Sequence, residues 1–356
     1  MPRVSPNSSS GRIQSPAMSQ HTIVLLPGDG IGPEVTHAAQ AVIDAAVSKN
    51  GSRIDWIEVP AGATALEQGH DNVLPQITID AIARHKVALK GPVTTPIGKG
   101  FTSVNVQLRK RLNLYAAVRP VRNLPGIKTR FENVDLVIVR ENTEGLYSGI
   151  ENEVAPGVVT SMKVATLVAC ERIAKYAFEY CRARGRKKVT VFHKANIMKL
   201  TDGLFINTAK RIRDTSYTEI EYEEVIIDAG CMRMVTEPSK FDVLLMENLY
   251  GDLVSDLCAG LVGGLGVVPG SNIGVDCAVF EAVHGSAPDI AGKGFANPLA
   301  VIMSGVMMLN HINERPSALL IRAAYDKVLA AGVTRTRDLG GTASTGDFAK
   351  AIIDAM

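Results

Sequence analysis

The chain contains 356 residues, of which 46% are hydrophobic and 21% are charged, and its formal net charge is +2. This length allows one large or two ordinary domains, and the composition is typical of a soluble globular protein. So small a net charge gives no reason to expect nucleic acid or an acidic membrane surface as a partner. The longest apolar run, residues 299–309, is too short to cross a bilayer, so we expect no membrane span.

The five cysteines are scattered along the chain, and none of them forms a CxxC spacing. This pattern is typical of buried structural thiols in a reducing compartment. We therefore expect a cytoplasmic protein, with the mitochondrial matrix as the alternative.

The first 20 residues are rich in serine and proline, carry Arg3 and Arg12, and contain no acidic residue. This composition predicts a disordered tail over residues 1–20. A transit peptide is the alternative, but three prolines and few apolar residues do not favour an amphipathic helix. We expect a dispensable or tag-like tail, with Met18 as a second candidate start.

Short apolar runs that read as strands alternate with helical patterns along the rest of the chain. This alternation predicts an α/β fold with a mainly parallel sheet, and no repeat or long linker marks a domain boundary. The clearest helices are predicted from residue 34 through Val47 and at 166–184, 203–214 and 298–310. Strands are predicted at 21–26, 54–59, 87–89, 114–118, 136–139, 189–192, 225–227, 243–246 and 278–281.

A glycine-rich turn, Gly28-Asp-Gly-Ile-Gly-Pro-Glu34, follows the first predicted strand. Dinucleotide-binding turns have a third glycine where this chain has Pro33, so the motif does not predict a Rossmann fold. It predicts only a tight turn whose backbone another group approaches closely.

Three arginines, Arg109, Arg119 and Arg140, end or follow strand-like segments within 32 residues of one another. A guanidinium at the exit of a buried strand is costly unless it is paired, and its planar fork matches a carboxylate. A local acid such as Glu141 or Glu144 offers one partner for a single arginine. Three arginines together favour a pocket for a polycarboxylate anion.

Tyr147 and Lys194 are candidates for proton transfer, although a structural tyrosine and a surface lysine are the simpler interpretations. Lys194 follows the apolar strand predicted at 189–192, where burial or neighbouring cations would lower the pKa of an amine.

Asp252 and Asp256 are four residues apart in a helix predicted to begin after a turn at Gly251, so their carboxylates share one face. The alternative is a solvated acidic face in which Asp252 helps to cap the helix. Leu253 and Leu257 make the helix largely apolar, and we expect it to be mostly buried. An acidic pair there favours a site for Mg²⁺ or Mn²⁺, which prefer oxygen ligands.

Residues 284–292 form a loop broken by glycine and proline, and its small residues suit close approach of a cofactor to the backbone. Asp289 is the notable acid, because a carboxylate accepts hydrogen bonds from ribose hydroxyls and repels a 2′-phosphate. The loop therefore favours NAD over NADP, with a simple turn aspartate as the alternative.

These segments occur in the order seen in the β-decarboxylating dehydrogenases, and from about residue 21 to its end the chain resembles that family. The family comprises isocitrate, isopropylmalate and homoisocitrate dehydrogenases, and the chain is most similar to the NAD-dependent isocitrate dehydrogenases. Glu247 departs from the pattern, because many relatives have proline there, and this puts the local turn in doubt. The matching segments are 28–34, 108–109, 118–120, 140–142, 193–198, 248–252 and 284–288.

The resemblance implies a non-Rossmann α/β fold with two domains and a mainly parallel sheet in the large domain. Residues 21–114 and 263–356 would form the large cofactor-binding domain, and residues 115–262 a small dimerisation domain. A clasp near residues 145–166 would join the two subunits of a homodimer.

The resemblance also implies a role for each candidate residue. Arg109, Arg119 and Arg140 would hold the substrate carboxylates, and Tyr147 would return a proton to carbon after CO₂ leaves. Lys194 would assist removal of the hydroxyl proton while hydride passes to the nicotinamide. The implied metal ligands are Asp252, Asp256 and, from the other subunit beside Lys194, Asp228, and the implied NAD contacts are His284, Gly285, Ala287, Asp289, Ile290 and Asn297.

Ser103 and Asn105, just before Arg109, help to distinguish between the possible substrates. Both are polar and suit a third carboxylate, whereas an apolar substrate would leave them unpaired at a cost of roughly 1–3 kcal/mol per buried group. We therefore predict oxidative decarboxylation of isocitrate with NAD. The alternatives are isopropylmalate or homoisocitrate dehydrogenase, or a catalytically silent regulatory subunit.

Overall fold

The fold is described from a computed structural model, which covers residues 19–95 and 102–356. The predicted tail therefore lies outside the described residues, except for its last two positions. None of the helices in the described ranges is long and apolar enough to cross a membrane. Four of the five cysteines are buried and all five are free, but Cys231 is only half-buried, so the expectation of uniformly buried thiols is wrong there.

The described chain forms twelve strands and eleven α-helices. The strands are β1 (Gln20–Leu26), β2 (Arg53–Glu58), β3 (Val87–Lys90), β4 (Ala116–Arg122), β5 (Asp135–Glu141), β6 (Glu151–Ala155), β7 (Val158–Ser161), β8 (Lys188–His193), β9 (Glu221–Ile226), β10 (Val243–Met246), β11 (Pro269–Ile273) and β12 (Ala278–Ala282). The helices are α1 (Gly32–Lys49), α2 (Ala63–Glu67), α3 (Gln76–His85), α4 (Val104–Arg111), α5 (Leu167–Ala183), α6 (Thr201–Ser216), α7 (Ile227–Thr236), α8 (Asn248–Val262), α9 (Leu299–His311), α10 (Arg315–Ala331) and α11 (Thr345–Ala355).

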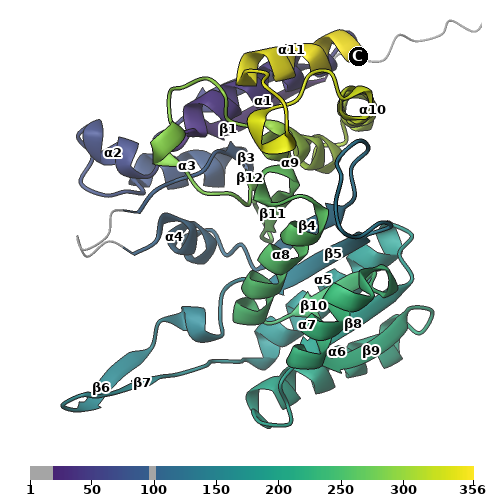
Figure 1. Ribbon diagram of the computed structural model, residues 1–356. Coiled ribbons are helices and arrows are strands. Elements are labelled where there is room, and N and C mark those ends of the chain that lie inside the picture. The colour runs from purple at the N-terminus through teal and green to yellow at the C-terminus, as the bar shows by residue number, and fades with distance from the viewer. Residues whose placement is uncertain (1–18, 96–101) are drawn as a thin grey trace, which may run out of the picture.

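Ten of the strands form one continuous sheet in the order β2-β1-β3-β12-β11-β4-β5-β10-β8-β9 (Figure 1). Both outer parts of the sheet are parallel, and the three antiparallel pairings, β12–β11, β11–β4 and β4–β5, lie together in the middle. The predicted α/β fold with a mainly parallel sheet is confirmed. The antiparallel centre was not predicted.

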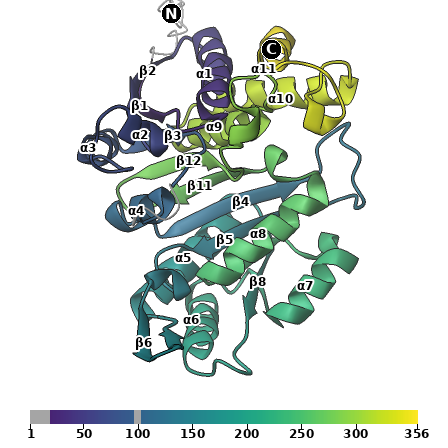
Figure 2. The same ribbon diagram turned by 60° about the vertical axis from the view of Figure 1, so that its left-hand side comes forward.

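Helices cover both faces of this sheet, and strands such as β10 are buried and apolar on both sides. Alternate residues of β5 divide between two cores, with Leu136 and Ile138 on the side of α7 and α8, and Val137 and Val139 on the side of α5 and α6. Figure 2 shows α8 lying across the first of these faces, over β4 and β5. Near the two ends of the chain, α1, α9, α10 and α11 pack against one another.

A two-stranded hairpin, β6–β7, extends away from the body of the protein (Figure 1). All of its strand residues are exposed, including the aliphatic side chains of Val154, Val158 and Val159. The hairpin lies inside the range 145–166 expected to form a clasp. The clasp itself and the two-domain division remain predictions, because the sheet runs without a break through both expected domains.

All nine predicted strands are present, but two details of the predicted elements are wrong. Ile227 begins α7 instead of ending a strand, and α8 begins at Asn248, three residues before the turn expected at Gly251. The strand β11 was missed because its sequence, Pro-Gly-Ser-Asn-Ile, contains residues that are rare in a central strand.

The glycine-rich turn after β1 is approached closely, as predicted, but by the protein's own backbone. Gly28 has φ +79°, and a Cβ atom there would lie 2.0 Å from the carbonyl oxygen of Pro92. Gly30 has φ +60°, and a Cβ atom there would lie 2.1 Å from the carbonyl oxygen of Ser286. The turn is therefore a packing contact between β1 and the loops that follow β3 and β12.

Substitution of Gly28 tests this close approach. We expect Gly28→Ala to lower the free energy of unfolding by about 2–4 kcal/mol, because positive φ and overlap with Pro92 both oppose a Cβ atom. Gly51 is the matched control, since it has φ +73° but no atom within 4 Å of an added Cβ. Gly51→Ala should cost only about 1 kcal/mol in the same urea titration. If both variants lose the same free energy of unfolding, the close approach of Pro92 contributes nothing to stability.

Candidate active site

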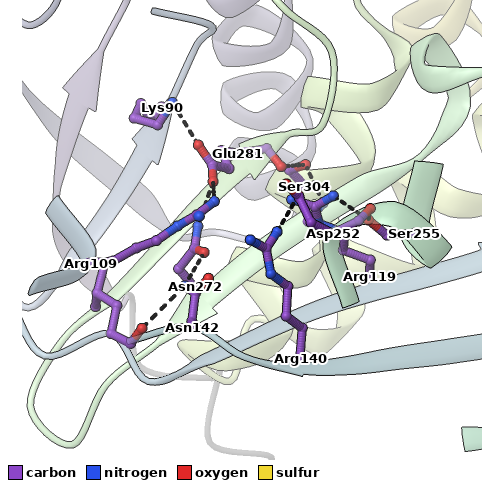
Figure 3. A network of polar contacts seen from close by, with 12 residues as sticks. Lys90, Arg109, Arg119, Arg140, Asn142, Asp252, Ser255, Asn272, Glu281 and Ser304 are labelled. Atoms are coloured by element: carbon purple, nitrogen blue, oxygen red, sulfur yellow. Dashed lines mark hydrogen bonds and ion pairs between the residues drawn. The ribbon is translucent and has the colours of Figure 1, made fainter. Parts of the chain in front are cut away.

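The three arginines predicted to bind an anion come together on one face of the sheet (Figure 3). Arg119 in β4 is paired with Ile138 in β5, and Arg140 lies two residues further along β5, so both side chains share a face. Arg109 reaches the same place from the last turn of α4. All three side chains are buried, and Arg140 is fully buried.

The two aspartates of α8 face these arginines. Arg140 donates a hydrogen bond to Asp252, and Nη1 of Arg119 lies 3.6 Å from a carboxylate oxygen of Asp256. Arg119 also donates to Oγ of Ser255 at 2.6 Å. The structure therefore places the acidic pair against the guanidinium cluster.

The helix α8 is less buried than its apolar sequence predicts. Leu253 is 62% exposed, and the side chain of Asp256 is 58% exposed. The expectation of a mostly buried helix is wrong on this side, because Leu253 and much of the Asp256 side chain face solvent in the described part of the chain.

Gly251 lies inside α8 and allows the helix to pack directly on Arg140. A Cβ atom at this position would lie 2.5–2.6 Å from Cγ and Cβ of Arg140. One turn earlier in the helix, Oδ1 of Asn248 accepts hydrogen bonds from Nε and Nη2 of Arg140 at 3.1 and 2.7 Å. Gly251 therefore serves close packing, and the turn predicted at this residue does not exist.

The site has an excess of positive charge at its centre. Burial and the neighbouring charge of Arg140 lower the pKa of Arg109 to about 10. Burial acts to raise the pKa of Asp252, but Arg140 and the other nearby guanidinium groups outweigh it, so this pKa lies below its ordinary value. Asp252 therefore remains ionised at neutral pH, and an anion placed among the arginines would relieve their mutual repulsion.

Tyr147 reaches the same site from the segment before the β6–β7 hairpin. Its hydroxyl donates a hydrogen bond to Asp252, and the guanidinium of Arg140 lies 5.2 Å from the centre of its ring. Burial and the contact with Asp252 raise the pKa of the Tyr147 hydroxyl. Tyr147 is therefore protonated at neutral pH and placed to donate a proton.

Lys194 and Asp228 form a separate pair, with Nζ of Lys194 2.7 Å from Oδ1 of Asp228. Neither contacts the arginines or the α8 aspartates among the described residues, where no three His, Cys, Asp or Glu side chains lie close enough to hold a metal ion. A single chain thus brings together two of the three predicted metal ligands. The backbone N–H of Lys194 donates to the buried carboxylate of Asp202 at 2.7 Å, a contact that sequence reasoning missed.

The start of the predicted cofactor loop and three of the five predicted substrate residues line one cavity of about 120 Å³. His284 and Gly285 lie on its wall together with Asn105, Arg109 and Arg119. Burial lowers the pKa of His284, so this imidazole is neutral at pH 7. Ser103 is exposed at the start of α4 and does not line this cavity.

The rest of the loop is more open. Ala287 has φ +38°, and its carbonyl accepts a hydrogen bond from the N–H of Ile290 at 3.1 Å, which forms a tight turn. The side chain of Asp289 in this turn is exposed to solvent. Asn297 is buried, and its amide donates a hydrogen bond to Asp338, outside the loop, at 2.8 Å.

Glu34, at the end of the glycine-rich turn, holds the far end of this loop. Its carboxylate accepts hydrogen bonds from the backbone N–H groups of Gly294 and Ala296 at 3.2 and 2.9 Å. This role depends on a contact 260 residues distant in sequence, so local spacing could not reveal it.

A buried polar chain of residues crosses the middle of the sheet and was also missed (Figure 3). Nζ of Lys90 lies 2.6 Å from the carboxylate of Glu281, which also accepts a hydrogen bond from Asn272 at 2.6 Å. Asn272 in turn accepts from Asn142 at 3.0 Å, and Nη2 of Arg109 lies 3.9 Å from Glu281. The only sequence signal was a charged residue within each of two apolar strands, β3 and β12.

Glu247, the departure from the family pattern, caps α8. Its carboxylate accepts hydrogen bonds from the backbone N–H groups of Leu249 and Tyr250 at 3.3 and 3.0 Å. It lies 3.7 Å from Nζ of Lys163. A side-chain cap therefore starts the helix at this position.

Comparison with known proteins agrees with this geometry. The family model for isocitrate/isopropylmalate dehydrogenase matches residues 22–352, and the chain belongs to that family. It is 51% identical to the mitochondrial NAD isocitrate dehydrogenase catalytic subunit 5 of Arabidopsis thaliana, over 98% of this chain and 94% of the relative. It is 50% identical to the chloroplastic 3-isopropylmalate dehydrogenase of Solanum tuberosum, over 86% and 85% of the two chains. The crystal structure of isocitrate dehydrogenase from Methylococcus capsulatus superposes with a TM-score of 0.89 at 48% identity, covering 94% of this chain and 99% of that one.

The buried pair of Lys90 and Glu281 predicts a pH-dependent contribution to stability. Burial acts to raise the pKa of Glu281, but Lys90 and Arg109 lower it to about 2. Because the folded pKa lies below the unfolded one, the pair stabilises the fold fully above about pH 5 and progressively less as the pH falls toward 2. We expect Glu281→Gln to lower the free energy of unfolding by roughly 3 kcal/mol at pH 7, and by less at pH 4.

Urea denaturation at the two pH values measures this difference. Glu151→Gln on the exposed strand β6 is the matched control and should leave the free energy of unfolding unchanged at both values. A loss in Glu281→Gln that is the same at pH 4 and pH 7 would contradict the assigned charge pairing.

Proposed function

We propose that the chain is an NAD-dependent isocitrate dehydrogenase that converts isocitrate to 2-oxoglutarate and CO₂. One observation carries this proposal. Three buried arginines, a tyrosine and two aspartates face one another beside a cavity whose other wall is the start of the loop assigned to NAD. This is the arrangement that oxidation and decarboxylation of a polycarboxylate require.

The lining of the cavity supports isocitrate as the substrate. Arg109 and Arg119 offer planar forks to carboxylates, and Asn105 adds an amide instead of an apolar contact. Overall identity does not separate the substrates, because the isopropylmalate dehydrogenase from potato is nearly as similar as the Arabidopsis isocitrate dehydrogenase subunit. Isopropylmalate or homoisocitrate dehydrogenase therefore remains the second candidate.

The residues present fit a divalent metal ion and NAD. Asp252 and Asp256 present carboxylate oxygens from one face of α8, which suits Mg²⁺ or Mn²⁺. When bound, the metal ion would polarise the substrate hydroxyl and stabilise the negative charge that follows loss of CO₂. Asp289, exposed at the tip of the loop, suits the ribose hydroxyls of NAD.

The remaining residues bind and transfer protons. Arg109, Arg119 and Arg140 fix the substrate carboxylates, and the protonated Tyr147 donates to the carbon from which CO₂ departs. Lys194 assists removal of the hydroxyl proton. These groups are intact, which favours a catalytic chain over a silent regulatory subunit.

We propose that a homodimer completes each site, with Lys194 and Asp228 supplied by the other copy. The support is an exposed aliphatic surface on α7, α8 and the β6–β7 hairpin, which a partner would cover. The chain would then consist of the large and small domains predicted from the sequence, with the hairpin as the clasp. The exposed aliphatic side chains are Met232, Val235, Leu253, Val154, Val158 and Val159.

The cellular location remains a proposal. The cytoplasm was predicted from the cysteines, with the mitochondrial matrix as the alternative. The Arabidopsis relative carries a mitochondrial name, which favours the alternative.

A steady-state assay tests the reaction. In Mn²⁺ buffer the purified chain should oxidise isocitrate with NAD about 100-fold more efficiently than isopropylmalate, because an apolar substrate leaves buried polar groups unpaired. The assay compares kcat/KM for both substrates with NAD and NADP. Activity should disappear in EDTA and return with Mn²⁺. Preference for isopropylmalate would establish an isopropylmalate dehydrogenase, and no turnover of either substrate would contradict the proposed reaction.

Mixing two inactive variants tests the shared site. Tyr147→Phe and Lys194→Ala should each be nearly inactive alone, because every site then lacks one proton-transfer group. A heterodimer of the two contains one site with both native groups, so a statistical mixture should regain about a quarter of wild-type activity. Mixing Tyr147→Phe with Tyr147→Phe/Lys194→Ala is the control and should regain none. No recovery in the first mixture, with exchange of subunits verified, would exclude a shared site.

A further inference from the structure

A second cavity, of about 760 Å³, lies on the sheet face opposite to the candidate active site. Val118 and Pro120 of β4 line it, whereas Arg119 between them points to the other face and binds Ser255. Because successive side chains of a strand point to opposite faces, the sheet itself separates the two cavities. We refer to this second cavity as the reverse cleft.

The reverse cleft is bounded by helices on two sides. Tyr176, Tyr180 and Arg184 line it from α5 and the turn after this helix. Arg322 and Tyr325 of α10 line the other wall, together with apolar residues of α9. A volume of this size lies within the range that small-molecule sites occupy, about 300–1,000 Å³.

Positive charge is in excess around the reverse cleft. Two of its basic side chains are neutralised, since Arg186 pairs with Asp135 and Asp242, and Arg122 pairs with Asp326. Three others form no ion pair within residues 19–95 and 102–356, and all three are exposed to solvent. These are Arg184, Lys187 and Arg322.

Aromatic rings lie beside these charges. The rings of Tyr176 and Tyr180 are stacked with their centres 6.3 Å apart and their planes inclined by 28°. The guanidinium of Arg184 lies 5.7 Å from the centre of the Tyr180 ring. On the opposite wall, Arg122 donates a hydrogen bond to the hydroxyl of Tyr325 at 3.3 Å. The cleft thus combines unneutralised cations with flat apolar surface.

We propose that the reverse cleft is a second ligand site that binds an aromatic phosphate ester. The phosphate would lie between Arg184 and Arg322, whose planar forks match its oxygens, and the ring would contact Tyr176 and Tyr180. This assignment does not depend on the proposed reaction, because none of these residues belongs to the candidate active site.

Fluorescence titration of the full chain with 1-naphthyl phosphate tests the proposal. Wild-type protein should bind the probe saturably, and Arg184→Ala/Arg322→Ala should bind it at least about tenfold more weakly, because both guanidinium contacts are lost. Both arginines are exposed, so this variant should fold with an unchanged unfolding midpoint and an unchanged basal activity.

The matched control is Arg182→Ala, two residues away in α5 but outside the cleft, where Arg182 pairs with Glu219. This variant should bind the probe as the wild type does. The uncharged probe 1-naphthol should bind much more weakly than the ester. Equal affinity of the wild type and the double variant, equal affinity for the two probes, or no saturable binding would each overturn the proposal.

Discussion

The fully buried guanidinium of Arg140 is the constraint on which the candidate active site depends. A charge removed from water is tolerated only where it is paired and hydrogen-bonded, and removing one partner of such a pair commonly costs about 3–5 kcal/mol. Asp252 and Asn248, both in α8, supply the partners. The position of α8 on the sheet, and with it the position of Asp256, is therefore tied to the charge of one β5 residue.

The antiparallel centre of the sheet explains how the other groups join Arg140. There, β4 and β5 place Arg119 and Arg140 on one face, and β12 brings Glu281, which pairs with Lys90 of β3, close to Arg109. The three antiparallel pairings make the parallel strands on either side of them run in opposite directions. The reversal at β11 and β4 brings segments from both halves of the chain to one place.

Much of the fold could be predicted, because strands such as 136–139 and 243–246 are uninterrupted apolar runs and helices such as α5 have clear periodicity. Local patterns failed where the physical reason was distant in sequence. Pro269 stands at the first position of β11, where a strand tolerates proline, and Gly251 makes room for Arg140, 111 positions earlier. Residue type and spacing were enough to predict the arginines and the α8 aspartates. The partners of Lys90, Glu281 and Glu34 are far away in the sequence, so no local pattern could predict those contacts.

Gly251, inside α8, limits which residue related proteins can have at the position that faces it. Glycine in a helix interior weakens that helix by about 1 kcal/mol relative to alanine, so its retention here indicates a compensating need. The need is geometric, because the missing side chain lets the helix backbone rest on the aliphatic stem of Arg140. The two positions should therefore vary together: a family member that carries a larger residue in place of Gly251 must shorten the facing side chain or move the helix outward. Moving the helix outward would widen the spacing between the carboxylates and the sheet, and a shorter side chain would remove the guanidinium that faces Asp252.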